Sequence, residues 1–417
     1  MSTQIPDPAP GTGRRPSTDW GTDFDHLDPR FVADPFPIYE ELRRSRPIAH
    51  TDRYHGVWIP TRYDDLAAIA HDHEHFSSRT ILITDRPQSP TDMGFHAPPI
   101  TEDPPYHTEI RRLLLPLFAP KVVAEYEPIT RALADELIDG FIDAGACDAA
   151  VDYAQHVPIK VITRMLGIPD GDHARFREWI HRLVEQSPLA DDATFDAILE
   201  IGAYLSEHID QHRRAPRDDI ISHLVDARMP DGRELTQQEI LGVCILLLLA
   251  GIDTTWSAIG AALLHLATHP DDRRRLRDEP AIIDAATEEF LRAFAPVTMA
   301  REVAVDTTVG GCPMRAGERL LLPFPSGNRD DAVFDRPDEI VLDRSPNRHF
   351  TFGVGIHRCL GSNLARMELR VALQAWVARI PEFSLIDPDA VTWSAGQVRG
   401  PRALPFRFTD DGREGSR

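Results

Sequence analysis

The stretch FGVGIHRCLG, residues 352–361, places one of the chain's four cysteines among three glycines and two residues after a histidine. In the sequence that follows, Leu369, Leu373 and Trp376 recur at steps of four and three, which predicts a helix with Cys359 at its N-terminus. Peptide dipoles and free N–H groups at such a position lower the pKa of a thiol. The pattern therefore indicates a thiolate held ready for a metal.

Cys359 has two other interpretations, a zinc ligand and a buried structural cysteine. Zinc is usually bound by about four ligands. The sequence has no second cysteine or histidine pair at the spacing from His357 and Cys359 that a zinc finger requires. A buried structural cysteine is the second alternative. Both are disfavoured, because the glycines let the backbone turn tightly and aim amides at the sulfur, and Phe352 can lie against whatever the sulfur binds.

A long apolar helix is the second feature. Thr236 and Glu239 form a capping signature, and the helical pattern runs to His269 before Pro270 stops it. The predicted helix has about 34 residues and is roughly 50 Å long. Its uncharged run, 240–252, is shorter than the roughly 20 residues of a membrane span, so we expect a buried core helix.

The middle of this helix reads AGIDTT, residues 250–255. Gly251 costs about 1 kcal/mol in a helix interior, and it removes a side chain where a flat group could approach. Asp253 and Thr254 offer a proton acceptor and a hydroxyl beside it. A kink satisfied by water is the alternative, and the residues alone leave both open.

Two further patterns are weak by themselves. Glu289 and Arg292 can share one face of a helix, yet Glu-x-x-Arg is usually a solvated surface pair. HDHEH, residues 71–75, suggests a metal, but residues at i and i+2 on a helix point apart. We therefore interpret it as a solvated helix end.

Taken together, these residues resemble the cytochrome P450 family. The family fingerprint Phe-x-x-Gly-x-His-x-Cys-x-Gly is matched by Phe352, Gly355, His357, Cys359 and Gly361. AGIDTT resembles the family's kinked central helix with its acid–alcohol pair. The motifs occur in the family's order, and the similarity spans roughly residues 30 to 410.

The resemblance implies a haem b cofactor with Cys359 as the axial iron ligand. It places Phe352, Gly353 and Gly251 beside the haem and Asp253 and Thr254 in proton delivery. The haem propionates would be bound by His107, Arg111, Arg301 and His357. Arg344 would complete a structural ion-pair triad with Glu289 and Arg292. A thiolate ligand favours O–O cleavage, so one oxygen atom of O2 would hydroxylate or epoxidise an apolar substrate.

The resemblance also places the substrate pocket. The candidates that it gives are Ile83, Met93, Phe95, Leu246, Leu249, Ala250, Val297, Thr298 and Val398. They indicate an apolar pocket with few hydrogen-bonding groups. A terpenoid, a steroid, a fatty acid or a small aromatic substrate would fit it equally well.

The chain shows no flavin domain, so by resemblance a separate ferredoxin and its reductase should supply electrons. Arg112, Arg358, Arg366 and Arg370 are the predicted basic patch that would steer an acidic ferredoxin. The net charge of −21 disfavours binding to nucleic acid or an anionic membrane. Scattered cysteines and the lack of a secretory segment predict a cytoplasmic protein without a membrane anchor, which we expect to be monomeric.

The expected fold is mainly α with a small β-rich region, the triangular prism of a cytochrome P450. Residues 1–22 are predicted to be a disordered tail and residues 23–417 a single domain. Two other functions stay open: an enzyme driven by hydrogen peroxide, and a haem-based gas sensor. Asp253 and Thr254 argue against the first, because peroxide already carries both protons and electrons. The lack of an output domain argues against the second.

Overall fold

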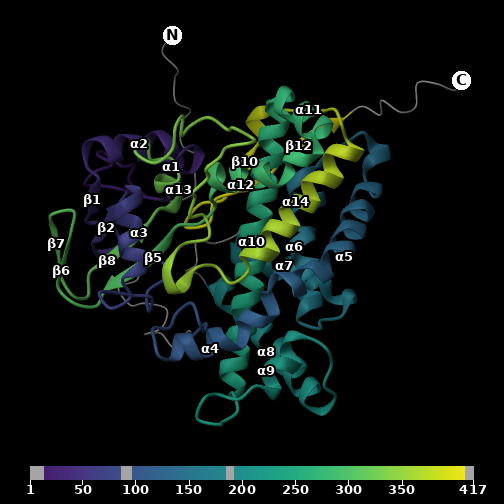
Figure 1. Ribbon diagram of the computed structural model, residues 1–417, viewed down its shortest axis with the longest axis horizontal. Coiled ribbons are helices and arrows are strands. Elements are labelled where there is room, and N and C mark those ends of the chain that lie inside the picture. The colour runs from purple at the N-terminus through teal and green to yellow at the C-terminus, as the bar shows by residue number, and fades with distance from the viewer. Residues whose placement is uncertain (1–13, 86–95, 185–191, 409–417) are drawn as a thin grey trace, which may run out of the picture.

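A computed structural model describes residues 14–85, 96–184 and 192–408 of the chain (Figure 1). Its fold is mainly α with a small β-rich region, as predicted. The α-helices are α1 (Pro29–Ala33), α2 (Phe36–Ser45), α3 (Tyr63–His71), α4 (Tyr106–Leu114), α5 (Pro120–Asp139), α6 (His156–Met165), α7 (His173–Val184), α8 (Asp192–Arg214), α9 (Ile220–Asp226), α10 (Gln237–Thr268), α11 (Pro270–Asp278), α12 (Ile283–Phe294), α13 (Phe324–Gly327) and α14 (Ser362–Arg379). The strands are β1 (Ile48–Thr51), β2 (Val57–Pro60), β3 (Phe76–Ser77), β4 (Ala146–Asp148), β5 (Met299–Val303), β6 (Thr307–Val309), β7 (Cys312–Met314), β8 (Arg319–Leu322), β9 (Phe383–Leu385), β10 (Thr392–Trp393), β11 (Pro401–Ala403) and β12 (Pro405–Phe408).

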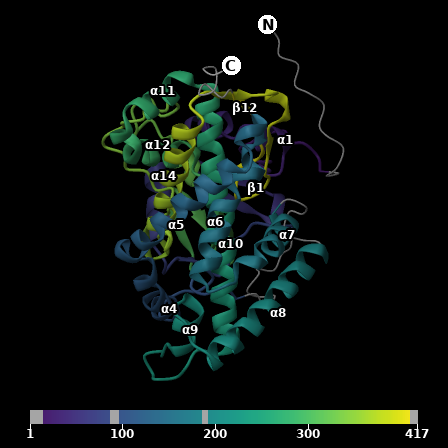
Figure 2. The ribbon, with the colours of Figure 1, turned by 90° about the vertical axis from the view of Figure 1, so that its right-hand side faces the viewer.

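Helix α10 runs through the middle of the molecule, packed against α6, α8 and α14 (Figures 1 and 2). Its start is fixed by the predicted capping box, because the Glu239 amide donates to the Thr236 hydroxyl and the Thr236 amide donates to the Glu239 carboxylate. Its 32 residues span about 48 Å. By length and composition α10 could cross a membrane, but 67% of its most apolar window is buried by the rest of the chain. This burial fits the predicted core helix.

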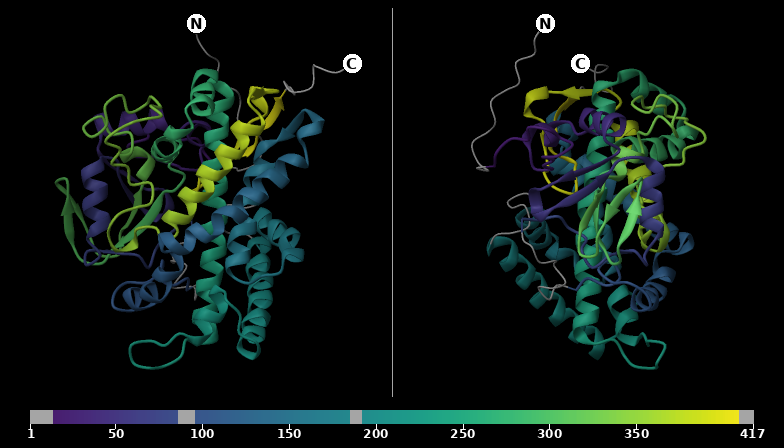
Figure 3. Two further views of the ribbon diagram at one scale, coloured as in Figure 1. Left: turned by 45° about the vertical axis from the view of Figure 1, so that its right-hand side comes forward. Right: turned by 90° about the vertical axis from the view of Figure 1, so that its left-hand side faces the viewer.

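The largest sheet lies to one side of α10 and has the strand order β1-β2-β8-β5-β3 (Figures 1 and 3). Strands β2 and β8 are parallel, and the other neighbours are antiparallel. Strands β1 and β2 form an antiparallel pair, and Asp64 lies in the first turn of the helix that follows, α3. Strand β5 matters for function because it carries Arg301.

The N-terminal part of the described chain packs against the domain. Ser17 is buried and its amide donates to Asp28, and Arg14 forms an ion pair with Asp25. Residues 14–22, which the sequence analysis assigned to the tail, therefore take part in the folded structure. Acidic side chains downstream hold this segment, and their contacts with it leave no local sequence pattern.

Candidate active site

Cys359 lies in the loop between a short 3₁₀ turn, Gly355–His357, and helix α14. The Cys359 amide donates to the Phe352 carbonyl at 2.7 Å, which closes the loop. Gly353 and Gly355 have φ angles of 65° and 74°, in the left-handed region that favours glycine. The tight turn predicted for these two glycines is confirmed.

The loop also needs room at Gly355. A Cβ atom there would collide with the carbonyl oxygen of Ala70 at the end of α3, so the glycine lets the loop lie directly on that helix. Gly361 differs, because its φ of −81° is open to any residue and a Cβ atom there would meet nothing within 4 Å. The requirement for glycine at position 361 therefore does not come from the backbone of this loop.

The pKa of the Cys359 thiol shifts in the opposite direction to the one predicted. Burial raises the pKa of its thiol, and this outweighs the opposite effects of the Gly361 amide and the guanidinium groups of Arg111 and Arg358. The helix-start amide acts in the predicted direction but is the weaker influence. The side chain is nevertheless exposed. Exposure together with strong desolvation indicates that the sulfur faces an enclosed space.

Helix α10 is open along one face at its middle. Leu246 and Leu249 are half-buried and Ala250 is exposed, although most residues of the helix are buried. Thr254 extends this face, since positions i, i+4 and i+8 of a helix lie in a row. The Thr254 hydroxyl donates to the Ala250 carbonyl at 2.8 Å and keeps its lone pairs as acceptors. Helix α10 packs against α14, the helix that begins just after Cys359.

Asp253 is 7% exposed and has a charged partner that the sequence did not predict. Its carboxylate accepts from Arg402 on β11. The Arg402 guanidinium also donates to the Ser257 hydroxyl at 3.2 Å and lies 4.2 Å from the centre of the Trp256 ring. The residues are 149 positions apart, so no spacing in the sequence could indicate the pair.

Gly251 does not lie as expected. A Cβ atom there would meet Ile162 of α6 at 3.3 Å. The missing side chain therefore allows α6 and α10 to pack closely. The structure gives no support to its prediction as a cofactor-binding residue, and Ala250 is the residue exposed on the open face.

The four nitrogen-bearing side chains that were predicted to bind the haem propionates lie close together. The ring centres of His107, on α4, and His357 lie 4.2 Å apart. Among the residues that the structure describes, neither ring nitrogen of His107 nor Nε2 of His357 has a hydrogen-bond partner. Arg111 and Arg301 complete the cluster, because their charges lower the pKa of His357. The structure thus brings together all four side chains.

The cluster is desolvated and electropositive. Burial, reinforced by Arg111, lowers the pKa of His107 to about 4, and burial, reinforced by Arg301, lowers that of His357 to about 2. Burial also lowers the pKa of Arg301 to about 10. A buried donor without an acceptor costs free energy. Two carboxylates from a bound group would accept from these imidazoles and guanidiniums, which is the donor set that a haem's propionates require.

His73 joins this cluster although the sequence did not indicate it. Its charge lowers the pKa of both His107 and His357, so it lies near them. Its Nδ1 atom is buried and lacks a partner within the described ranges. The sequence analysis placed His73, with the rest of residues 71–75, at a solvated helix end. That prediction is wrong for His73.

The remainder of HDHEH behaves as predicted. Helix α3 ends at His71, which is exposed, and the His75 ring pairs with Asp72 at 2.9 Å. Over residues 14–85, 96–184 and 192–408, no three histidine, cysteine or acidic side chains are grouped to bind a metal ion.

Glu289 and Arg292 are not a surface pair. Both are fully buried, and Arg292 Nε donates to Glu289 Oε2 at 2.8 Å. Arg344 Nε donates to both carboxylate oxygens at 3.0 Å, and the Val341 amide and the Asn347 amide group also donate to Glu289. The triad that the resemblance implied is present. Such complete hydrogen bonding is what a buried carboxylate needs.

Several pocket candidates meet at one wall. Val297 and Val398 form an isolated β-bridge, and both are half-buried. Thr298 and Ile83 are buried and are joined to the same wall through Gln397. Leu246, Leu249 and Ala250 line the open face of α10, while Met93 and Phe95 lie outside the described residues.

The predicted basic patch is only partly basic. Arg366 Nε donates to Glu288 at 2.6 Å and Arg370 donates to Glu127 at 2.7 Å, so acids neutralise both. Arg112 and Arg358 are exposed. The sequence could not show these acidic partners, which come from α12 and α5.

Known proteins share this architecture. The family profile described as Cytochrome P450 matches residues 159–386. The mycinamicin IV hydroxylase/epoxidase of Micromonospora griseorubida is 35% identical over 376 residues, which are 88% of this chain and 94% of that protein. The vitamin D(3) 25-hydroxylase of Pseudonocardia autotrophica is 36% identical over 386 residues, 90% of this chain and 94% of that protein. The solved structure of cytochrome P450 PksS from Bacillus subtilis 168 is 31% identical, with a TM-score of 0.85, covering 93% of this chain and 100% of that chain.

The chain belongs to the cytochrome P450 family, and its fold is the cytochrome P450 fold. It is a cytochrome P450 monooxygenase whose cofactor is haem b, bound through a cysteine thiolate. The residues present fit this cofactor, because Cys359 offers a sulfur on an internal space and the cluster around His107 offers unpartnered donors for two carboxylates.

Proposed function

We propose that this enzyme hydroxylates or epoxidises a bulky, mainly apolar ring compound, with O2 and with electrons from a separate ferredoxin and ferredoxin reductase. The observation that carries the proposal is the pair Asp253 and Thr254 on α10, with the Thr254 hydroxyl on the open face of the helix. A haem bound through the Cys359 thiolate would supply the activation of dioxygen.

The residues of the chain would manage protons and solvent. The Thr254 hydroxyl, anchored on the Ala250 carbonyl, can accept a hydrogen bond and pass a proton at its oxygen. The Asp253 carboxylate, held by Arg402, can take up a proton and release it towards Thr254. Apolar side chains around this pair limit the access of water.

The pocket and the relatives together favour a lipophilic ring compound. The described candidates are apolar except for Thr298, whose hydroxyl and amide are both directed to the Gln397 carbonyl. Two relatives are named for mycinamicin IV and vitamin D(3), and a structure of CYP109E1 from Bacillus megaterium, 31% identical, contains testosterone. These are large molecules, which narrows the substrate classes that the sequence left open.

We infer that an acidic ferredoxin docks near Arg112 and Arg358, which are exposed. Arg111, a member of the cluster, donates to the Arg358 carbonyl. All four cysteines are free thiols, which supports a reducing cytoplasmic location. The monomeric state and the single domain that spans residues 23–417 stay predictions.

The first test is the absorption spectrum of the reduced protein with carbon monoxide, for the wild type, Cys359→Ser and Cys312→Ser. Cys312, on β7, is a matched control outside the site. We expect the red-shifted Soret band of a thiolate ligand in the wild type and in Cys312→Ser, and its loss in Cys359→Ser. A haem-loaded wild type without this band would contradict the proposal.

A second test concerns the electron source. NADH consumption with a surrogate ferredoxin and its reductase should rise when testosterone, vitamin D(3) or a macrolide that binds is added. Turnover with hydrogen peroxide and none with the redox partners would instead establish the peroxide-driven alternative. Ligand binding without turnover under either condition would favour a gas sensor.

A further inference from the structure

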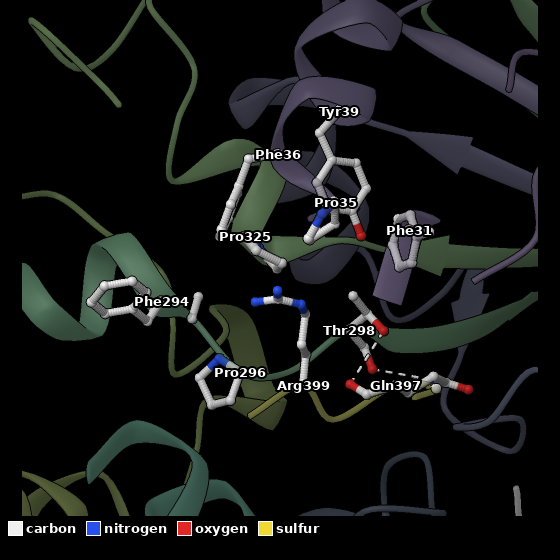
Figure 4. A pocket seen from close by; sticks show the side chains of 12 residues that line it. Phe31, Pro35, Phe36, Tyr39, Phe294, Pro296, Thr298, Pro325, Gln397 and Arg399 are labelled. Carbon is white, nitrogen blue, oxygen red and sulfur yellow. Dashed lines mark hydrogen bonds between the residues drawn. The ribbon is translucent and has the colours of Figure 1, made fainter. Parts of the chain in front are cut away.

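The side chain of Gln397 connects three segments of the pocket wall. Its Oε1 atom accepts from the Ile83 amide. Its Nε2 atom donates to the carbonyl oxygens of Ile81 at 3.1 Å and of Thr298 at 3.0 Å. Its backbone carbonyl accepts from the Thr298 amide at 2.8 Å, and Figure 4 shows Gln397 beside Thr298. Both donors of the side-chain amide are therefore in use.

No continuous strand ladder could replace these bonds. The Ala300 amide donates to the Ile81 carbonyl at 3.1 Å, and Val297 pairs with Val398 as an isolated bridge. Between these two contacts, the loop after β3 and the turn around Gln397 are not part of a strand, and the Thr298 amide makes a single backbone bond to Gln397. The Gln397 amide group bridges that gap.

Burial makes the bridge rigid. Gln397 is 8% exposed, as is Thr298, and Ile83 is 4% exposed. On the side shown in Figure 4, Gln397 lines a cavity of about 20 Å³ that also touches Arg399 and Phe31. That space is about the size of one water molecule and admits no organic substrate. Gln397 therefore has little room to move away from the wall.

We propose that Gln397 is a positioning residue that sets the width of the substrate pocket and so determines which substrates fit by size. The inference rests on the proposed function, because the wall that it holds belongs to the proposed pocket. Its side chain acts through Ile83, Val297, Thr298 and Val398, and the three backbone groups that it satisfies are removed from contact with an apolar ligand. In the described part of the chain, its side-chain hydrogen bonds all go to this wall.

Two substitutions at position 397, with side chains of nearly the same size as Gln, separate the effect of side-chain size from the effect of its hydrogen bonds. Gln397→Met keeps the length of the side chain but removes all three hydrogen bonds. The Ile83 amide and the Thr298 carbonyl lose the partners that Gln397 gives them, whereas the Ile81 carbonyl keeps the Ala300 amide. Gln397→Glu keeps an acceptor for the Ile83 amide. Its ionised carboxylate would face the carbonyl oxygens of Ile81 and Thr298, whereas its protonated form offers one O–H donor in place of Nε2. Gln374→Met is the matched control, because Gln374 lies on α14 and bonds Arg131.

The experiment measures ligand binding to the ferric holoenzyme by optical titration. Imidazole is the small probe, and clotrimazole, an imidazole that carries a bulky triarylmethyl group, is the large one. We expect Gln397→Met to weaken clotrimazole about tenfold or more while imidazole stays within about twofold of the wild type. For Gln397→Glu, the affinity for clotrimazole relative to that for imidazole should be close to the wild-type value at low pH. This relative affinity should fall as the carboxylate ionises at higher pH. Gln374→Met should change neither affinity.

Hydrogen exchange supplies a readout that is independent of the haem. The Ile83 amide should exchange faster in Gln397→Met than in the wild type or in Gln374→Met. Unchanged clotrimazole affinity in both Gln397 variants, or an equal loss of both ligands, would overturn the proposal. If Gln397→Met does not fold, the pH dependence of Gln397→Glu decides alone. A failed proposed function is recognised separately, because the wild type would then lack the thiolate band.

Discussion

The Arg402 guanidinium binds the Asp253 carboxylate at the middle of α10, and the two side chains are 8% and 9% exposed. The pair joins the last part of the chain to the acid that we propose for proton delivery. A guanidinium in this position holds the carboxylate in one orientation, and Ser257 and Trp256 in turn hold the guanidinium. Proton delivery would therefore depend on a residue that lies far outside the helix motif.

Replacing Arg402 by Gln should damage both stability and coupling. The change leaves a buried carboxylate without its charged partner, which costs about 3–5 kcal/mol of unfolding free energy. Displacement of Asp253 should also divert reducing equivalents, so that more hydrogen peroxide forms per NADH consumed. Urea unfolding and a peroxide assay measure the two effects. Arg407→Gln, an exposed arginine on β12, is the control.

A double-mutant cycle tests whether the two residues act as a pair. If they do, adding Asp253→Asn to Arg402→Gln should recover part of the lost stability, because it removes the buried charge that has lost its bond to Arg402. Strictly additive losses in the two single variants and the double variant would show that Arg402 acts through its packing on Trp256 instead.

Thr254→Ala should separate proton delivery from folding. The hydroxyl donates to the Ala250 carbonyl, which the helix already satisfies, so its loss should leave thermal stability nearly unchanged. We expect product formation per NADH to fall severalfold and peroxide formation to rise. Thr268→Ala is a close control, since Thr268 donates to the Leu264 carbonyl in the same way at the end of α10. Equal coupling in both variants would contradict the assigned role.

Local patterns predicted much of this protein. The capping box at Thr236 and Glu239 fixed the start of α10, and Gly353 and Gly355 have the turn geometry that was predicted for them. These predictions succeeded because each depends on residues within a few positions of one another. The class of enzyme came from the resemblance of these motifs, in their order, to the cytochrome P450 family.

Contacts between distant segments could not be predicted. Arg402 and Gln397 meet their partners across 149 and 314 residues, and neither lies in a pattern that suggests a role. Gly251 shows the opposite error, because a glycine in a helix signals close approach but not which neighbour approaches, and here it is Ile162. Tertiary packing decides such roles.

The buried triad should be indispensable to folding. Arg292→Lys cannot reproduce the paired bonds that Arg292 makes to Glu289 at 2.8 Å, and it leaves buried acceptors unsatisfied. We expect the unfolding free energy to fall by about 3–5 kcal/mol and haem to be lost at lower temperature. Arg336→Lys is the control, because its pair with Glu339 has the same spacing on the surface. Similar melting temperatures for both variants would contradict the structural role.

Ferredoxin docking should depend on the exposed arginines rather than on those already paired. Arg112→Gln and Arg358→Gln should slow reduction by ferredoxin about tenfold at low ionic strength, and the effect should shrink as salt is added. Arg370→Gln is the comparison, since Glu127 already neutralises Arg370. Stopped-flow reduction measures the rates. Equal slowing by all three variants would show that the whole patch binds the partner.

Glu368 should make stability depend on pH in the opposite sense to most acids. It is fully buried on α14, where the Thr255 hydroxyl bonds it, and burial raises its pKa from 4.5 to about 8. The folded state therefore binds this proton more tightly than the unfolded state, and the stability that the neutral acid contributes is lost as pH rises from about 4.5 to about 8.

Glu368→Gln is neutral at every pH and should remove this loss. Its advantage over the wild type in unfolding free energy should be about 4 kcal/mol larger near pH 9 than near pH 5. Urea unfolding of the holoenzyme at the two pH values measures it, with the exposed Glu234→Gln as the control. A constant difference across this range would mean that Glu368 ionises inside the fold at its ordinary pKa, and that Thr255 and its surroundings solvate the carboxylate.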